Sequence, residues 1–365
     1  MPEQTRVAVD GFQLGDGSER RGFGTVVRRL LTGLGAEPDL RLAVLGAPST
    51  AVPPGATLVP VRRHRWRPRL AAIEHEVRLP LDLRRVHADV VLSPASFPPR
   101  RSPAPLVQVL HDLTPLVFPH PFTAHEAGRW RRSAPALRRA ERIVAISRST
   151  ARQGIEQLGL DPARVEVIHH GSDPAFTPGG APDGGEPYVL SVGAYGPHKG
   201  FAEAMAVIGA LATQGYPHRL RIVGPQDDWM LARIAELVAA SPRPDRVDVL
   251  GWVPDLVGEY RGAATLLFTS RAEGFGLPLL EAMGCGTPVV AFDNTSIPEV
   301  VGDAALVVAD GDVAAATRAA CAVLDDPTVT ARLRAAGPER AATFRWDRAI
   351  SAYADAVRAA GKARA

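Results

Sequence analysis

The stretch at residues 269–288 constrains the fold more than any other part of this sequence. It follows a short apolar run, residues 264–268, of the kind that forms a fully buried strand in a parallel sheet. A glycine-rich corner comes next, and then an apolar segment that is typical of a helix, with Pro278 suited to its first turn and Gly284 or Gly286 to its end. The sequence therefore predicts a corner between a strand and a helix, which is where open α/β sheets bind ligands.

The residues of this corner indicate the chemistry of the ligand. Gly274 and Gly276 have no Cβ, so the backbone can approach a ligand closely, and the amino end of the following helix favours an anion. Glu273 and Glu281 flank the corner, and because they would repel a phosphate they are better suited to accept hydrogen bonds from hydroxyl groups. A ligand with a phosphate and two sets of hydroxyls is a sugar nucleotide. A lone Gly-x-Gly, by contrast, is better interpreted as an ordinary turn before a helix that Glu281 caps or solvates.

Strand-like and helix-like segments alternate along the chain in two series, which predicts two doubly wound α/β domains. The 365 residues are long for one core and sufficient for two. In the first series a glycine-rich loop follows the strand at residues 6–10 and precedes a helix expected at residues 25–34. Residues 177–187 have the composition of a linker, and the second series starts with a strand at residues 188–192.

A glycine-rich loop also follows the first strand of the second series, and it contains Lys199. The chain has only two lysines, Lys199 and Lys362, among 42 basic residues. A compact ammonium group at a corner between strand and helix is well placed for a diphosphate, and arginine does not replace it in every geometry.

Several of these motifs resemble those of the family-4 retaining glycosyltransferases, which have the GT-B fold. The most specific is E-G-F-G-L-P-x-x-E with its Glu-x7-Glu spacing, continued by E-A-M-G-C-G-T-P-V-V. Further resemblances are H-D-L-T-P-L at residues 111–116, the segment at residues 169–176 and F-R-W at residues 344–346. The resemblance implies an acceptor-binding domain at residues 1–176, the linker, a donor-binding domain at residues 188–343, and a final helix at residues 344–365 that returns to the first domain.

The resemblance also implies a role for each matching residue. His111, Glu273 and Lys199 are expected to be catalytic; Glu273 would contact the transferred sugar, Lys199 the diphosphate and Glu281 the ribose. Gly22, Gly24 and Asp112 are expected on the acceptor side. The remaining donor-binding residues would supply backbone contacts to the diphosphate or lie against the base: Gly193, Gly251, Trp252, Val253, Gly274, Phe275, Gly276 and Leu277. A packed position for Trp252 is equally compatible with the sequence.

Two positions depart from the family pattern. Ala194 stands where family members often carry an arginine, so either Lys199 acts with backbone amides alone or another arginine replaces it, Arg271 being one candidate. His170 stands where asparagine is usual, and we attach little weight to this change because the segment ends the first domain.

No metal or cofactor is expected. The motif Asp310-Gly311-Asp312 suggests a divalent cation, but it separates a strand from an alanine-rich helix, so we interpret it as a turn in which Asp312 caps the helix. His169 and His170 are adjacent and would point to opposite sides. The two cysteines, Cys285 and Cys321, are too few for a disulfide framework or a metal site.

The location of the protein is predicted to be cytoplasmic, because the chain has neither a membrane span nor the pattern of a signal peptide. An arginine-rich face at residues 62–85 is most simply a solvated surface, with peripheral contact to an anionic inner membrane as the alternative. A net charge of +3 and scarce aromatics argue against nucleic acid as a partner.

The function predicted from the sequence is metal-independent transfer of a hexose-like group from a nucleotide diphosphate sugar to an acceptor hydroxyl, with retention at the anomeric carbon. GDP-mannose is the first candidate donor, with UDP- and dTDP-sugars open, and the acceptor is a glycan, glycolipid or secondary metabolite. The alternatives are a sugar-nucleotide-binding protein without transfer activity and an epimerase of the GT-B fold.

Overall fold

The computed structural model describes residues 4–14, 22–61, 78–94, 97–120, 123–180, 185–225 and 227–362, without the side chain of residue 13. The chain forms two compact units. The first unit comprises residues 1–171 and 346–365, and the second comprises residues 172–345. Each unit is described by itself below.

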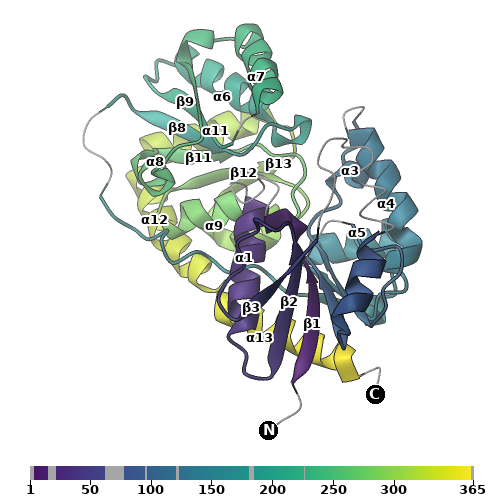
Figure 1. Cartoon of the computed structure of the whole chain (residues 1–365). Helices are drawn as coiled ribbons and strands as arrows, with labels where there is room; N and C mark the ends of the chain where they lie inside the picture. The colour runs from purple at the N-terminus through teal and green to yellow at the C-terminus, as the bar shows by residue number, and fades with distance from the viewer. Residues whose placement is uncertain are drawn as a thin grey trace. The chain divides into compact units, whose positions relative to one another are not determined.

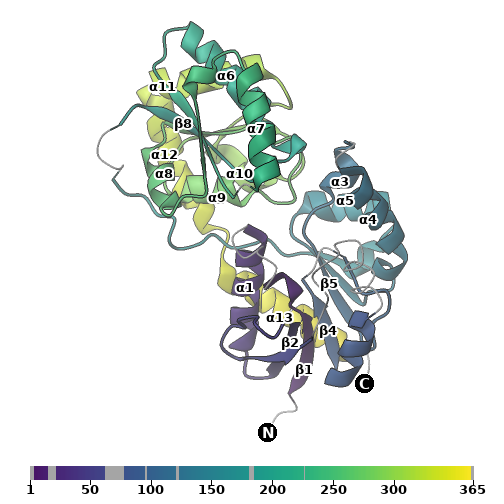
Figure 2. The same cartoon turned by 45° about the horizontal axis from the view of Figure 1, so that its top comes forward.

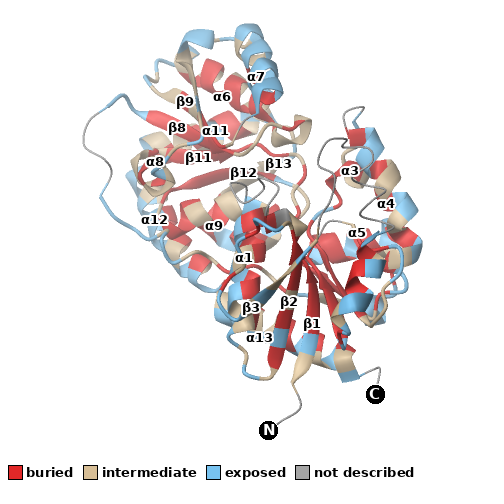
Figure 3. Ribbon diagram, in the orientation of Figure 1, coloured by how far each residue is buried: buried red, intermediate tan, exposed pale blue. Residues whose placement is uncertain are grey.

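The first unit is built on a parallel sheet that has seven strands among the described residues, in the order β3-β2-β1-β4-β5-β6-β7. Short apolar runs supply these strands, and most of their residues are buried, as expected for a sheet covered on both faces (Figure 3). The strands are β1 (Thr5–Asp10), β2 (Leu40–Gly46), β3 (Ala56–Pro60), β4 (Val90–Ser93), β5 (Leu106–Leu110), β6 (Arg142–Ala145) and β7 (Val165–Val167).

Helices join and cover these strands (Figure 1). They include α1 (Gly22–Gly35), α3 (Thr114–Val117), α4 (Ala124–Leu137), α5 (Arg148–Leu158) and a helix at residues 78–86. The helix predicted at residues 25–34 starts earlier, because Gly22 and Gly24 form its first turn rather than the loop before it. Ser147 caps α5, accepting a hydrogen bond from the Thr150 amide at 3.0 Å.

The last helix, α13 (Trp346–Lys362), packs on the first unit although it follows the second unit in sequence. It contacts α1 and the strands β1, β4, β5 and β6, and Figures 1 and 2 both show it beside α1. Gly33 makes room for it, since a Cβ there would lie 2.2 Å from the Ile350 Cδ1. Arg358 adds ion pairs to Glu37 at 2.6 Å and Asp39 at 2.8 Å. The predicted return of the last helix to the first unit is confirmed.

The second unit has a parallel six-stranded sheet within the described residues, in the order β10-β9-β8-β11-β12-β13. Its strands are β8 (Tyr188–Val192), β9 (Arg219–Val223), β10 (Val247–Gly251), β11 (Thr265–Phe268), β12 (Val289–Asp293) and β13 (Leu306–Ala309). Its helices are α6 (Phe201–Thr213), α7 (Asp228–Ala240), α8 (Leu256–Gly262), α9 (Leu277–Gly284), α10 (Ile297–Val301), α11 (Val313–Asp325) and α12 (Pro327–Ala342).

The strand order of the second unit reverses direction between β8 and β11, its two central strands. In a doubly wound sheet the connections from these two strands leave on opposite faces, which opens a crevice at their carboxyl ends. Residues 193–200 follow β8 and residues 269–276 follow β11. The two glycine-rich segments singled out in the sequence therefore meet at the ligand-binding edge of this sheet.

The connection between the units was predicted at residues 177–187, of which residues 181–184 lie outside the described part of the chain. Residues 177–180 and 185–187 have neither helical nor strand structure. Arg261 donates hydrogen bonds to the Thr177 carbonyl at 2.9 Å and hydroxyl at 3.1 Å, so this segment is bound to the second unit. None of the helices among the described residues is both long and apolar enough to span a membrane.

Candidate functional site

A charged pair occupies the carboxyl ends of β8 and β11. The ammonium group of Lys199 donates a hydrogen bond to Glu273 Oε1 at 2.7 Å. Both side chains are largely buried, with 21% of Lys199 and 12% of Glu273 exposed. A pair at this distance is a strong, charge-assisted contact, and the structure brings together two residues that lie 74 positions apart in the sequence.

The surroundings of Glu273 keep it ionised. Burial by itself raises the pKa of Glu273, but Lys199 and the nearby His198 outweigh burial, so its pKa lies below the usual value for glutamate. The pKa of His198 is lowered to about 4, mainly by burial and also by the Lys199 charge. At neutral pH the site therefore holds a carboxylate beside a neutral imidazole.

The corner after Glu273 has the predicted form. Gly276 adopts φ +98°, a left-handed conformation that favours glycine, and α9 starts directly after it with Pro278 in its first turn. Ser296, which is fully buried, donates hydrogen bonds to the carbonyls of Glu273 at 3.1 Å and Phe275 at 3.0 Å. These two bonds fix the peptide planes of the corner at the amino end of a helix, where anions are stabilised.

Glu281 lies one turn into α9 and is held by a residue that the sequence did not single out. The hydroxyl of Tyr260, from α8, donates to Glu281 Oε2 at 2.8 Å. Burial raises the pKa of Glu281 to about 7, and the Tyr260 hydrogen bond opposes this rise. Tyr260 stands in the short helix α8 and belongs to none of the motifs quoted above, so no pattern in the sequence revealed it.

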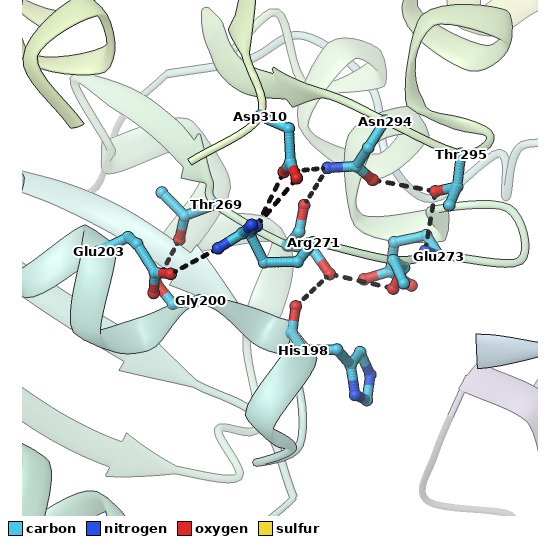
Figure 4. A network of polar contacts seen from close by, with 11 residues as sticks. His198, Gly200, Glu203, Thr269, Arg271, Glu273, Asn294, Thr295 and Asp310 are labelled. Carbon is cyan, nitrogen blue, oxygen red and sulfur yellow. Dashed lines mark hydrogen bonds and ion pairs between the residues drawn. The ribbon is translucent and has the colours of Figure 1, made fainter. Parts of the chain in front are cut away.

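Arg271 belongs to a network that supports the site (Figure 4). Its Nε atom lies 3.0 Å from both carboxylate oxygens of Asp310, and Nη1 lies 3.3 Å from Glu203 Oε1. Its amide donates to the His198 carbonyl at 2.7 Å. Because two carboxylates already engage the guanidinium group, the structure argues against the prediction that Arg271 replaces the arginine missing at Ala194.

The same network continues to the loop after β12 (Figure 4). Asn294 donates to Asp310 Oδ1 at 2.9 Å and to the Ser270 carbonyl at 2.8 Å. Thr295 accepts from the Glu273 amide at 3.0 Å and donates to Asn294. Thr295 has φ +42°, which is unfavourable for a β-branched residue and costs on the order of 1–3 kcal/mol. The loops after β8, β11, β12 and β13 are thus tied together around Glu273.

Gly200 brings the two central loops into contact. It has φ +68°, and a Cβ at this position would lie 1.9 Å from the Thr269 carbonyl oxygen. Thr269 also donates its hydroxyl to the Gly200 carbonyl at 2.7 Å. No other residue fits at position 200 without moving the loop that carries Lys199.

The loop after β10 supplies exposed residues. Trp252 is 62% exposed, so the interpretation of Trp252 as a packed aromatic is wrong. Gly251 has φ +67° and accepts a hydrogen bond from the Gly224 amide at 2.8 Å, while Val253 is half-buried. Gly193 directly follows β8, and its amide donates to the Val223 carbonyl at 2.8 Å. β10, β9 and β8 are neighbours, so these residues follow adjacent strands at the same edge of the sheet.

The residues considered for a metal have other partners. Asp312 caps α11 as predicted, accepting from the Ala315 amide at 2.8 Å. Asp310 binds Arg271 and Asn294. In the described part of the chain no three His, Cys, Asp or Glu residues are grouped so as to hold a metal ion.

His111 lies at the carboxyl end of β5 in the first unit and is buried. Its Nε2 atom lies 2.9 Å from the Pro94 carbonyl oxygen. Because a carbonyl can only accept, Nε2 carries the proton and Nδ1 is the acceptor in the neutral ring. Burial lowers the pKa of His111 to about 4, and the hydrogen bond to Pro94 opposes this shift. The ring is therefore neutral at physiological pH.

Aromatic rings surround His111 and connect it to both ends of the first unit. Phe23, in the first turn of α1, packs edge-on against it with the centroids 4.5 Å apart. His170 lies 5.9 Å away on its other flank and stacks on Trp346 at the start of α13, at 5.7 Å. His170 is thus a neighbour of His111, a role that the sequence analysis missed because it judged the change from asparagine unimportant.

Some of the residues predicted on the acceptor side lie close to His111. Gly22 and Gly24 flank Phe23, so the start of α1 lies beside His111. Asp112 accepts a hydrogen bond from the Thr114 amide at 3.1 Å, which stabilises the turn into α3. Residues 62–77 of the predicted arginine-rich face lie outside the described part of the chain, and of its arginines the structure describes Arg78, Arg84 and Arg85.

Two Rossmann-like units, one with an anion-binding corner flanked by acids, define a protein of the GT-B class. The family models agree: residues 174–340 match "Glycosyl transferases group 1", and residues 20–176 match "Glycosyltransferase Family 4". The chain belongs to this glycosyltransferase family.

Curated relatives support the same membership. The chain is 30% identical over 311 residues to D-inositol 3-phosphate glycosyltransferase 1 of Catenulispora acidiphila, covering 77% of this chain and 74% of that protein. It is 36% identical over 175 residues to O-antigen chain mannosyltransferase B of Escherichia coli, covering 46% of this chain and 45% of the relative. The chain therefore spans less than half the length of the second protein.

Solved structures share the fold at low sequence identity. Sucrose-phosphate synthase from Thermosynechococcus elongatus superposes with a TM-score of 0.83 at 19% identity, over 99% of this chain and 100% of that chain. Anabaena HepE, solved in complex with UDP and glucose, gives 0.72 at 19% identity over 97% and 99%. WaaG, involved in lipopolysaccharide biosynthesis, gives 0.75 at 16% identity over 96% and 99%. The prediction of the GT-B fold is confirmed.

Proposed function

We propose that this protein transfers a hexose-like sugar from a nucleotide diphosphate sugar to an acceptor hydroxyl, with retention at the anomeric carbon. The observation that carries the proposal is the Lys199–Glu273 pair at the edge where the central strands β8 and β11 end. It puts one positive and one negative group beside the anion-binding corner of α9, as a donor with a charged diphosphate and a neutral sugar requires.

Within this proposal the second unit binds the donor. Lys199 and the amides at the start of α9 neutralise the diphosphate, whose negative charge grows as the bond to the sugar breaks. Glu273 accepts hydrogen bonds from hydroxyls of the transferred sugar, and Glu281 from those of the ribose. Before the donor binds, Glu273 keeps the ammonium group in place, so little reorganisation precedes the reaction.

The first unit binds the acceptor in this proposal. His111 is neutral and offers Nδ1 as a hydrogen-bond acceptor, which suits an alcohol that must be oriented and relieved of a proton. We propose attack on the face from which the nucleotide leaves rather than a covalent intermediate. Glu273 is the only carboxylate in our proposed donor contacts that faces the sugar, and Lys199 already engages it.

Metal independence is part of the proposal. It is supported by the engagement of Asp310 by Arg271 and of Asp312 by the cap of α11, which leaves the diphosphate to Lys199 and backbone amides. Activity is then expected to survive complete chelation of divalent cations by EDTA, and a strict requirement for added magnesium or manganese would contradict this part of the proposal.

The donor sugar is the open substrate question. A mannosyltransferase among the relatives makes GDP-mannose the first donor to test, and the UDP and glucose bound by Anabaena HepE make UDP-glucose the second. A thermal-shift screen with GDP, UDP and dTDP selects the base, because a nucleotide at a hundredfold excess over its Kd adds about 2.7 kcal/mol of stability.

The decisive experiment measures donor hydrolysis and nucleotide affinity together. The selected sugar nucleotide should be hydrolysed slowly to the free nucleotide by the unmodified chain. Calorimetry should show weaker nucleotide binding in both Lys199→Ala and Glu281→Ala. Unchanged affinity in both variants would refute the proposed donor site. Tight binding without any hydrolysis or transfer would instead support a sugar-nucleotide-binding protein.

A further inference from the structure

Tyr260 is held in place by contacts to both its ring and its backbone. It lies in α8, and no part of its side chain is exposed. Phe176 packs edge-on against its ring with the centroids 5.7 Å apart, and the Thr287 hydroxyl donates to its carbonyl at 2.7 Å. Both the ring and its backbone are therefore fixed, and so is the direction of the hydroxyl.

The hydroxyl of Tyr260 is directed at Glu281. It donates to Oε2 at 2.8 Å, whereas Oε1 receives no hydrogen bond from any residue that the structure describes. Glu281 also has no ion pair with a described residue, in contrast to Glu273, which is paired with Lys199. A half-buried carboxylate with one oxygen held by Tyr260 and the other free of hydrogen bonds from described residues is arranged to accept a further donor.

We propose that Tyr260 is a positioning residue for the donor: it holds Oε2 of Glu281, so that Oε1 is presented to a ribose hydroxyl of the nucleotide. This inference rests on the proposed function, which assigns Glu281 to the ribose. It also gives the site a preference for nucleotides with ribose hydroxyls, because a nucleotide without them leaves Oε1 unsatisfied and loses the contact.

The titration of Glu281 gives this device a measurable signature. The pKa of Glu281 is raised to about 7: burial is the main cause, the Tyr260 hydrogen bond opposes the rise, and Asp173 adds to it. Cys285, from the end of the same helix, is the other titratable group that faces it. Since the ionised carboxylate is the form that accepts from ribose hydroxyls, nucleotide affinity should fall as the pH is lowered through about 7.

The test compares Tyr260→Phe with a matched control, Tyr188→Phe. Tyr188 is also a buried tyrosine of the second unit, and its hydroxyl donates at 2.8 Å to the Glu259 carbonyl, not to Glu281. Calorimetry is run with UDP and 2′,3′-dideoxy-UDP, and in parallel with GDP and 2′,3′-dideoxy-GDP, between pH 5.5 and pH 8.5. Glu281→Gln completes the set, since it removes the titrating group.

We expect Tyr260→Phe to weaken UDP or GDP binding about tenfold, which corresponds to ~1.4 kcal/mol. Binding of the dideoxy nucleotides should change less than twofold. The midpoint of the affinity profile should move to higher pH, because the hydrogen bond that lowers the pKa of Glu281 is lost. Tyr188→Phe should leave affinity and midpoint unchanged, and Glu281→Gln should remove the pH dependence assigned to this group.

The outcomes separate this inference from the proposed function. If Tyr260→Phe behaves like Tyr188→Phe while Glu281→Ala loses binding, Tyr260 is structural only and the inference is wrong. If Glu281→Ala and Lys199→Ala both bind nucleotides normally, the donor site itself is wrong. A measurement on the unmodified chain covers the case in which Tyr260→Phe does not fold. The Glu281 carboxyl carbon, followed by NMR, must titrate near pH 7 and shift to lower pH with UDP or GDP, and a titration that nucleotide does not move overturns the inference.

Discussion

The two units share one architecture, yet the carboxyl edges of their sheets carry different chemistry. In the second unit the edge is ionic, with Lys199 bonded to Glu273 and Arg271 held between two carboxylates. In the first unit the edge around His111 is neutral and aromatic, and burial keeps both His111 and His170 uncharged. The same architecture therefore carries charged groups at this edge in the second unit and neutral hydrogen-bonding groups in the first.

This difference matches the two substrates of the proposed reaction. A diphosphate is doubly charged and gains charge as it leaves, so fixed cations and helix amides stabilise it. An acceptor hydroxyl is neutral and must lose a proton, so an uncharged imidazole with a defined tautomer serves it better than an ion. The contrast can be tested by removing charge from one edge and hydrogen-bonding capacity from the other.

The largest effect is expected from the ionic edge. Lys199→Met should lower the kcat/KM for the donor about 10³-fold, the loss typical of removing one preorganised group that stabilises developing negative charge. It also leaves Glu273 buried without a cation, so the free energy of unfolding at pH 7 should fall by ~2–3 kcal/mol. Steady-state kinetics and denaturant unfolding measure the two effects.

A double variant separates the effect on activity from the effect on stability. Lys199→Met with Glu273→Gln removes both charges, so it should regain most of the lost stability while activity stays low. If activity returned together with stability, the Lys199–Glu273 pair would be structural, and its charges would have no part in binding the donor.

A smaller loss is expected from the neutral edge. His111→Asn should reduce kcat about 10²-fold, as for the loss of a general base, with UDP or GDP affinity unchanged. Because the pKa of His111 is lowered to about 4, the ring stays neutral above pH 5. Protonation of His111 should therefore not lower the kcat of the unmodified protein between pH 8 and pH 5.5. Any fall of kcat in this range should also occur in His111→Asn. A fall with a midpoint near 6.5 that His111→Asn abolishes would show that His111 titrates like an exposed histidine.

We expect the ionised form of Glu281 to lower the stability of the folded protein. Its pKa is raised to about 7 from an ordinary 4.5, so the folded state disfavours the carboxylate, and stability falls as the pH rises from about 4.5 to 7. Glu281→Gln should therefore raise the free energy of unfolding by ~1–3 kcal/mol at pH 8 and by much less at pH 4.5. Urea unfolding at the two pH values measures this, and an equal effect at both would contradict the raised pKa.

The positions of the strands along the chain and the corner of the second unit were predictable because both are marked by local sequence. Apolar runs four or five residues long mark the strands, and Gly276 with Pro278 marks the start of α9. The helical start at Gly22 was missed because glycine is a poor helix former, and packing of Phe23 on His111 outweighs that preference.

Contacts between distant segments were not predictable. The pairing of Tyr260 with Glu281 joins two helices, and neither sequence position signals it, since a buried tyrosine is usually only a core residue. The two carboxylates on Arg271 come from positions 203 and 310, far from it in the chain. A sequence shows that a charge is present, but whether that charge is already neutralised depends on the tertiary structure.

The smallest effect is expected for Arg271. Its substitution tests how many of the charged side chains at the ionic edge act on the ligand directly. Arg271→Met should lower kcat about five- to tenfold, ~1–1.4 kcal/mol, because Glu273 is held by the loops that Arg271 ties together. Affinity for UDP or GDP should change less than twofold. Asp310→Asn, which weakens the same tie from its other end, should reproduce the loss, and the two substitutions together should add little.

An exposed pair in the same unit supplies the control for Arg271. Arg233→Met removes an arginine paired with Glu236 at 2.8 Å on the surface of α7, and it should change neither kcat nor affinity. If Arg271→Met instead loses nucleotide diphosphate affinity tenfold or more while Asp310→Asn does not, Arg271 contacts the diphosphate directly. The ionic edge would then carry two cations for the ligand, and Arg271 would have to leave Asp310 and Glu203 when the diphosphate binds.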